Sequence, residues 1–136
     1  MEIKLKGRVA SKGKVEGEAV VFHEPIPMFV LYATMDQSTG VMNLPGHELD
    51  GKVIKDRVWV YPCGCGGVGY ILYILKKLGA GPRAIINMKP WDHDIIDAVL
   101  ARLPMVYGFD GNILELIKSG DHVTVDANEG VVTLSK

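Results

Sequence analysis

Residues Arg57–Gly79, RVWVYPCGCGGVGYILYILKKLG, constrain the fold of this chain more than any other stretch. Arg57–Tyr61 is rich in β-branched and aromatic residues, which predicts a buried strand, and Pro62 ends it because proline has no N–H for a sheet. Six of the next seven residues are Gly or Cys, and Tyr70–Leu78 follows as a largely apolar helix closed by Gly79. Such a strand, glycine loop and helix can direct several backbone N–H groups at one anion. The alternative is a tight turn that needs glycine only for its backbone angles.

Composition indicates a soluble, intracellular protein of one domain, residues 1–136. The hydrophobic fraction is 48% and the charged fraction 23%, both ordinary for a globular chain. A net charge of −1 gives no reason to expect nucleic acid or an anionic membrane as a partner. The two cysteines are one residue apart, a poor spacing for a disulfide, so we expect a reducing, cytoplasmic setting. No signal-peptide core or membrane-spanning apolar run is present in the sequence.

The rest of the chain predicts an α/β fold with a β-rich N-terminal half and a βαβα C-terminal half. In the first half the patterns predict short strands and no helix, at Ile3–Val9, Gly17–Phe22 and Met28–Thr34. After the glycine loop they predict strands and helices in alternation, at Ala84–Met88, Asp92–Arg102, Met105–Tyr107 and Asn112–Lys118. A hairpin, His122–Val125 with Val131–Leu134, closes the fold.

Gly64–Gly69 fits the dinucleotide-binding pattern G-x-G-x-x-G between a strand and a helix. That pattern normally opens the first βαβ unit, whereas here a long β-rich half precedes it. The acidic residue expected at the end of the next strand is also missing, since Asn87 and Met88 stand there. These two features argue against a nucleotide and leave dinucleotide binding as an alternative.

Three further candidates for chemistry are Cys63, Cys65 and His47. A thiol at the start of a helix has its pKa lowered from roughly 8.5 toward neutrality, which would give Cys65 thiolate character. A zinc site needs about four ligands, and no second cysteine pair or histidine pair accompanies C-x-C. His47 lies in a predicted loop, where its imidazole could exchange protons near neutral pH or could simply cap the loop.

The chain resembles the aconitase X swivel domain family over nearly its whole length. The segments that carry the resemblance are, in order, Gly7–Val9, Gly17–Val20, Asp36 with Thr39–Val41, Pro45–Gly51, Val58–Pro62, the glycine loop, Gly79 with Pro82 and Ala84–Ile86, Leu103–Val106, Ile117 with Gly120-Asp121, Val123 and Val125, and Gly130–Val132. Their order and spacing together are more specific than any one of them.

This resemblance implies a swivelling β/β/α fold and a larger partner chain that holds an iron or iron–sulfur centre. It implies no cofactor on this chain and elimination of water from a hydroxy acid, such as 5-phosphomevalonate or a hydroxyproline-like substrate. In the family a serine in the glycine loop acts as the base. Here no serine or threonine occurs between Pro62 and Gly79. Counting forward from Pro62 puts Gly67 in its place, and counting back from Gly79 puts Cys65 there.

The leading hypothesis is therefore a small subunit of an aconitase-X-like hydro-lyase, incomplete without its large chain. Gly64, Gly66, Gly67 and His47 would bind the substrate, Cys65 would accept the proton, and the partner's metal would polarise the leaving hydroxyl. A second hypothesis is a binding or assembly module that keeps the fold without the chemistry. Dinucleotide binding through Gly64–Gly69 is the third.

Overall fold

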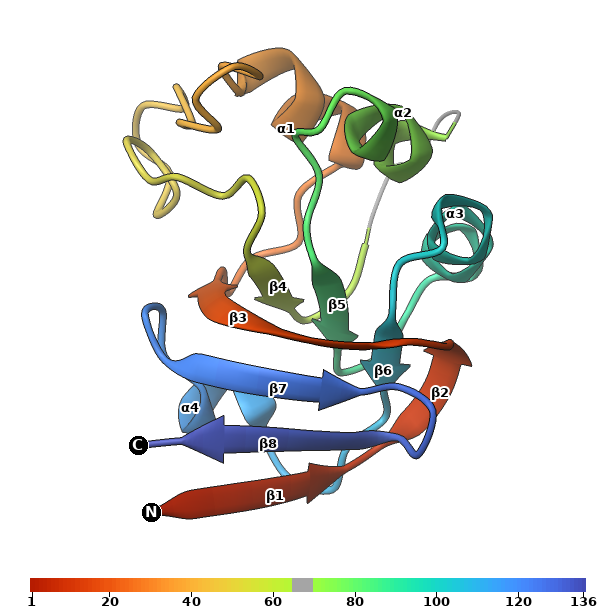
Figure 1. The fold of residues 1–136 in the computed structure, drawn as a ribbon. Helices are drawn as coiled ribbons and strands as arrows, with labels where there is room; N and C mark the ends of the chain where they lie inside the picture. Colours follow the sequence, from red (N-terminus) through yellow and green to blue (C-terminus); the bar gives the residue numbers. More distant parts are fainter. Residues whose placement is uncertain (65–69) are drawn as a thin grey trace.

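Two β-sheets that share one strand form the protein, with three of its helices on one side and a fourth, short helix on the other (Figure 1). The computed structural model describes residues 1–64 and 70–136. Strands β1 (Glu2–Lys6), β8 (Val131–Ser135), β7 (His122–Asp126) and β3 (Lys14–Val21) make an antiparallel sheet. Strand β3 continues into a second sheet with β4 (Val58–Tyr61), β5 (Ala84–Asn87) and β6 (Met105–Tyr107), all parallel, and β2 (Arg8–Ser11) runs antiparallel along β6.

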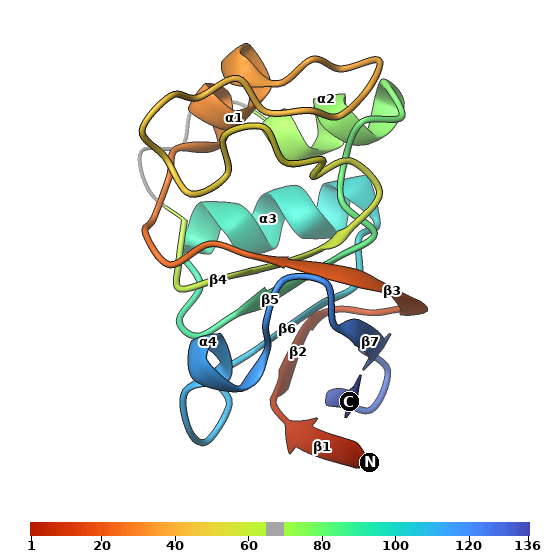
Figure 2. The same ribbon diagram turned by 90° about the vertical axis from the view of Figure 1, so that its left-hand side faces the viewer.

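The layers are helix, parallel sheet and antiparallel sheet (Figure 2). Helices α1 (Met28–Thr34), α2 (Ile71–Lys77) and α3 (Asp92–Ala101) lie on one face of the parallel sheet. The antiparallel sheet and the short helix α4 (Ile113–Leu116) cover the other face. This arrangement confirms the expected swivelling β/β/α fold.

Strand β4 has buried side chains on both faces and so joins two hydrophobic cores. Trp59 and Tyr61 pack with the helices, while Val58 and Val60 pack with the antiparallel sheet. All four side chains are fully buried, as expected for a central parallel strand covered on both sides. The indole N–H of Trp59 donates to the Ile54 carbonyl at 2.7 Å, which ties the strand to the loop before it.

Most of the predicted elements are confirmed, within a residue or two at their ends, but Met28–Thr34 is wrong. It forms helix α1 and not a strand, so the N-terminal half is not composed of strands alone. Met28 and Leu31, three residues apart, are buried, whereas Phe29 is exposed, which is the spacing of one helical face. A seven-residue apolar run does not distinguish a strand from a helix by periodicity.

The predicted strand Ile3–Val9 is also divided in two. It breaks at Gly7, and the two pieces, β1 and β2, join different sheets. A Cβ on Gly7 would lie 2.7 Å from the Tyr107 carbonyl oxygen and 2.8 Å from Val106 Cγ1. The chain therefore crosses between the sheets at a place where only glycine fits.

Candidate functional site

The candidate site lies where the parallel strands β4 and β5 end. Tyr61 and Asn87 are opposite each other in the register of these two strands, at their carboxyl ends. The chain leaves β4 through Pro62, Cys63 and Gly64 and returns as helix α2. Ligands of open α/β sheets bind outside the carboxyl ends of the strands, so the glycine loop occupies the expected edge.

A buried polar cluster lies directly behind this edge. Tyr61 and Asn87 are fully buried, and Asp94, in the first turn of α3, is 4% exposed. The Asn87 amide Nδ2 donates to the Tyr61 carbonyl at 3.2 Å, and the Tyr61 ring stacks on Phe22 with centroids 4.7 Å apart. Burial, followed by the charge of Asp94, raises the pKa of the Tyr61 hydroxyl well above its usual value.

Each residue of this cluster has one buried polar atom that finds no hydrogen-bond partner among the described residues. The three atoms are the Tyr61 hydroxyl oxygen, Asn87 Oδ1 and Asp94 Oδ2. A buried polar atom without a partner costs about 1–3 kcal/mol, and native proteins keep few of them. Their concentration at the strand ends marks this cluster as more than packing.

Gly64 is buried against the Asp94 carboxylate. An ideal Cβ on Gly64 would lie 2.5 Å from Asp94 Cγ and nearer still to both carboxylate oxygens. Burial raises the pKa of Asp94 above its ordinary value, while the backbone N–H groups of Trp91 and Gly64 and the charge of His93 act in the opposite direction. The first glycine of the loop therefore lies where a carboxylate takes up the space of its side chain.

Asp97, one helical turn further along α3, caps helix α2. The Leu72 N–H donates to Asp97 Oδ2 at 2.8 Å, and the Tyr73 N–H donates to Oδ1 at 3.1 Å. Asp97 is 2% exposed, and its burial raises the pKa of the carboxyl despite these two hydrogen bonds. The expectation that the N–H groups of this helix await an external anion is wrong for these two, because an internal carboxylate already accepts them.

His47 caps its own loop. Its Nδ1 accepts the Leu49 N–H at 3.1 Å, and its backbone N–H donates to the Leu44 carbonyl at 3.1 Å. The neighbouring Glu48 accepts both the backbone N–H and the ring of His23, at 2.7 and 2.9 Å. These bonds agree with the capping alternative for His47, and its substrate-binding role stays a prediction.

The predicted residues Cys65, Gly66 and Gly67 lie outside the residues that the structure describes. Cys63 is described and carries a free, half-buried thiol. Within residues 1–64 and 70–136, no three His, Cys, Asp or Glu side chains are grouped so that they could hold a metal ion. The described residues thus do not fit an iron centre.

Tyr61, Asn87, Asp94 and Asp97 were not among the site residues predicted from the sequence. Asp94 belongs to Trp91-Asp92-His93-Asp94, which is more simply interpreted as an ordinary helix start. A usable signal existed, because Asp94 and Asp97 share the helix face of Ala98 and Ala101, which is buried. Two carboxylates on an apolar face need partners inside the protein.

A central parallel sheet with helices on one face and an antiparallel sheet on the other, and a glycine loop at the strand ends, define a swivelling β/β/α domain. The model of the aconitase X swivel domain matches residues 4–134. The chain belongs to this family. No helix in the described part of the chain is long and apolar enough to cross a membrane.

Curated relatives and a solved structure give the same picture. The chain is 38% identical to the phosphomevalonate dehydratase small subunit of Methanosarcina acetivorans, over 98% of this chain and 92% of the relative. It is 35% identical to the phosphomevalonate dehydratase small subunit of Archaeoglobus fulgidus, over 97% of this chain and 98% of the relative. The holo-form of aconitase X from Thermococcus kodakaraensis is 32% identical, with a TM-score of 0.84 over 98% of this chain and 99% of that one.

Proposed function

We propose that this chain is the small subunit of a two-chain phosphomevalonate dehydratase, with residues 1–136 acting as one swivel domain. The observation that carries the proposal is the 38% identity to a curated small subunit over almost the full length of both chains. In the reaction a base takes a proton from carbon, a double bond forms to the neighbouring carbon, and the hydroxide that leaves that carbon takes up a proton to become water. The family resemblance implies an iron or iron–sulfur centre in the large subunit.

In this proposal the glycine loop supplies this chain's half of the active site. Backbone N–H groups of Gly66 and Gly67 bind the carboxylate or phosphate of the substrate, and His47 contributes a further hydrogen bond. Gly64, which was also predicted to bind substrate, faces the Asp94 carboxylate with its N–H and would act by fixing the start of the loop. Cys65 accepts the proton in place of the serine that the family has in this loop. Support comes from the position of the loop, which follows Tyr61 at the carboxyl end of β4.

The test is dehydration of 5-phosphomevalonate by the two chains together and by each chain alone. We expect activity only from the pair. Cys65→Ala should lower kcat by about 10²-fold or more, the usual contribution of a general base. The matched control is Cys63→Ala, which removes the other thiol of C-x-C and should retain activity. Full activity of Cys65→Ala would remove Cys65 from the mechanism, and an inactive wild-type pair would favour a binding module or, if NAD binds, a dinucleotide site.

The large subunit, in our proposal, docks on the outer faces of α2 and α3. Large apolar side chains are exposed there, among them Tyr73, Ile74, Leu78, Ile96, Val99 and Leu100. A groove of about 460 Å³ between the two helices is lined by Tyr73 and Leu100 together with basic side chains. Clustered exposed apolar side chains mark interaction surfaces.

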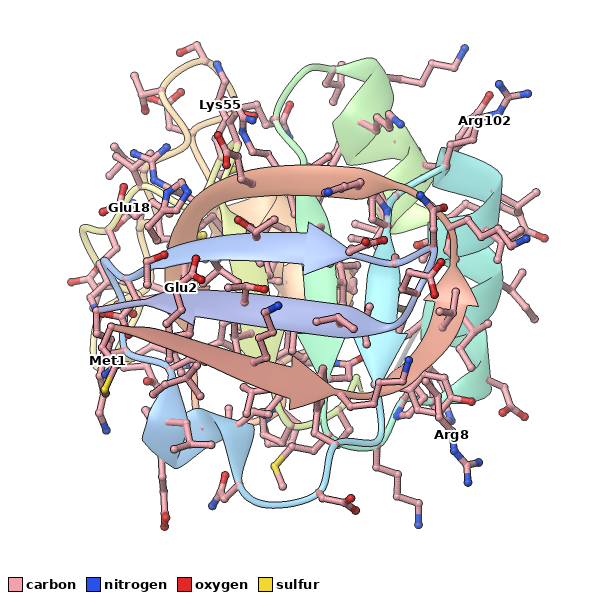
Figure 3. The ribbon with its side chains drawn as sticks, turned by 60° about the horizontal axis from the view of Figure 1, so that its bottom comes forward. Met1, Glu2, Arg8, Glu18, Lys55 and Arg102 are labelled. Atoms are coloured by element: carbon pink, nitrogen blue, oxygen red, sulfur yellow. The ribbon has the colours of Figure 1, made fainter. Side chains whose placement is uncertain are left out.

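The opposite face of the molecule has a different character. Charged and polar side chains cover the outer surface of the antiparallel sheet, where Figure 3 labels Glu2 on β1. The exposed residues of β1 include Lys4 and Lys6. Of these two faces, that of α2 and α3 therefore suits a partner that needs an apolar contact.

Leu100→Asp should weaken association with the large subunit by at least tenfold, because it puts a charge into the proposed contact. Leu100 is 50% exposed, so its replacement should leave the fold of the isolated chain intact. The control is Leu116→Asp on α4, on the other side of the parallel sheet, at 37% exposure. Equal affinity of both variants in a titration with the large subunit would move the interface elsewhere.

A further inference from the structure

Capping accounts for only part of the buried carboxylate of Asp94. The N–H groups of Trp91, at the N-cap of α3, and of Gly64 face this carboxylate, but its Oδ2 has no hydrogen-bond partner among the described residues. By comparison, each of the two carboxylate oxygens of Asp97 accepts an N–H group of α2. Asp94 nevertheless lies 96% buried, since only 4% of it is exposed, and it touches the first glycine of the loop. A buried carboxylate with one unpartnered oxygen costs folding free energy, and its place at the edge of the candidate site calls for a functional explanation.

We propose that Asp94 is a positioning residue for the glycine loop of the dehydratase: its carboxylate occupies the place of a Gly64 side chain and fixes where the loop leaves strand β4. The proposal rests on the proposed function. Asp94 acts through Gly64 and not on the substrate, because its oxygens are covered. Asp94 belongs to helix α3, and Asp97 on the same helix accepts N–H groups at the start of α2. Helix α3 therefore contacts the chain both where it enters the loop and where it leaves it.

The charge on Asp94 is the means by which it holds the loop. The groups that act on it are the Tyr61 hydroxyl from β4, His93, Asp97 and the Trp91 N–H from α3, and the Gly64 N–H. The Trp91 and Gly64 N–H groups and the charge of His93 favour the carboxylate, while burial and the charge of Asp97 favour the neutral acid. The carboxylate attracts the Gly64 N–H more strongly than the neutral acid does, so Gly64 should be held more firmly when Asp94 is ionised than when it is protonated.

Asp94→Asn separates this role from simple packing. Asparagine has the same shape without the charge, so the variant should lose activity and gain stability at neutral pH. Because burial raises the pKa of Asp94, the folded state holds this proton more tightly than the unfolded state does. The contribution of Asp94 to the free energy of unfolding is therefore fully present below the ordinary pKa of about 4, which applies in the unfolded state. It is lost as the pH rises through the raised pKa of the folded state.

The experiment compares wild type, Asp94→Asn and Asp92→Asn in the two-chain enzyme. For Asp94→Asn we expect kcat to fall roughly 10- to 100-fold, as a displaced active-site loop would cause, with KM little changed and the acid limb of the pH profile lost. Its Tm should exceed that of wild type at pH 7 and match it near pH 3. Asp92 is exposed on the same helix, and its variant should behave as wild type in every readout.

A second readout needs no substrate. In the ¹⁵N-labelled chain, the Gly64 amide should shift with the titration of Asp94 in wild type and in Asp92→Asn, and should not shift in Asp94→Asn. The proposal would be overturned by full activity of Asp94→Asn or by a Tm of this variant below that of wild type at pH 7. A Gly64 amide shift in wild type that does not follow the titration of Asp94 would also overturn it. An inactive wild-type pair would refute the proposed dehydratase instead, and the amide titration would still decide whether Asp94 positions the loop.

Discussion

Gly64→Ala should destabilise the fold by about 3 kcal/mol and abolish most activity, because the new methyl group and the Asp94 carboxylate cannot share one place. Both partners are buried, so neither can move into solvent. Either α3 shifts away from the sheet or the chain after β4 does, and both movements displace the loop. Urea unfolding of wild type and variant measures the loss, from the change in midpoint at unchanged m-value.

The clash predicts a specific non-additivity. Asp94→Ala removes the obstructing carboxylate, so Gly64→Ala should cost at least 1–2 kcal/mol less in that background than in wild type. Gly46→Ala is the control for loss of a glycine as such. Gly46 has φ 85° and no atom within 4 Å of the added Cβ, so its replacement should cost about 1–2 kcal/mol from the backbone alone, independent of residue 94. Equal costs of Gly64→Ala in both backgrounds would contradict the contact.

Asp97→Ala should destabilise the protein by about 2–4 kcal/mol. It removes the acceptor of two first-turn N–H groups, at Leu72 and Tyr73, and each buried donor left alone costs about 1–3 kcal/mol. Helix α2 has only seven residues, and the side chain of its N-cap residue, Tyr70, makes no capping hydrogen bond, so little else holds its start. Thermal unfolding, with Asp92→Ala as the exposed control on the same helix, gives the measurement.

The space that Asp97→Ala leaves permits a chemical rescue. Formate or acetate carries a carboxylate of the right size, and binding to the folded variant alone should raise its Tm with concentration. Wild type keeps its own carboxylate there and should show no such rise at equal ionic strength, which sodium chloride sets in the reference samples. Identical behaviour of both proteins would mean that the two N–H groups find other acceptors.

Local sequence patterns predicted the elements on both sides of the glycine loop, and physical reasons explain where they failed. Strand β4 and helices α2 and α3 carry strong signals, since a β-branched run and a helical spacing differ in period. Helix α1 carries none that separates it from a strand over seven residues. The division at Gly7 depends on Tyr107 and Val106, a hundred residues away, and such tertiary crowding leaves no mark in a local pattern.

The sequence predicts where the candidate site lies but not all of the residues that form it. The glycine loop indicated where chemistry belongs, because its residue types and position suffice for that. The carboxylates at Asp94 and Asp97 come to the loop from a different βα unit, and only the pairing of β4 with β5 and the packing of α3 on α2 bring them there. For the Leu72 N–H, the expectation of an external anion was wrong for the same reason, because its acceptor, Asp97, lies 25 residues away in the chain.

Strands β1 and β8 pair along their whole length, from Glu2 opposite Ser135 to Lys6 opposite Val131. During synthesis β1 leaves the ribosome more than a hundred residues before its pairing partner exists, and it must wait unpaired until then. The antiparallel sheet is therefore expected to be completed last, when β8 pairs with β1. Until then, the face of the parallel sheet that the antiparallel sheet covers stays incompletely buried. The faces of α2 and α3 that we propose for the large subunit therefore belong to a domain that is complete only once β8 has been made and has paired with β1.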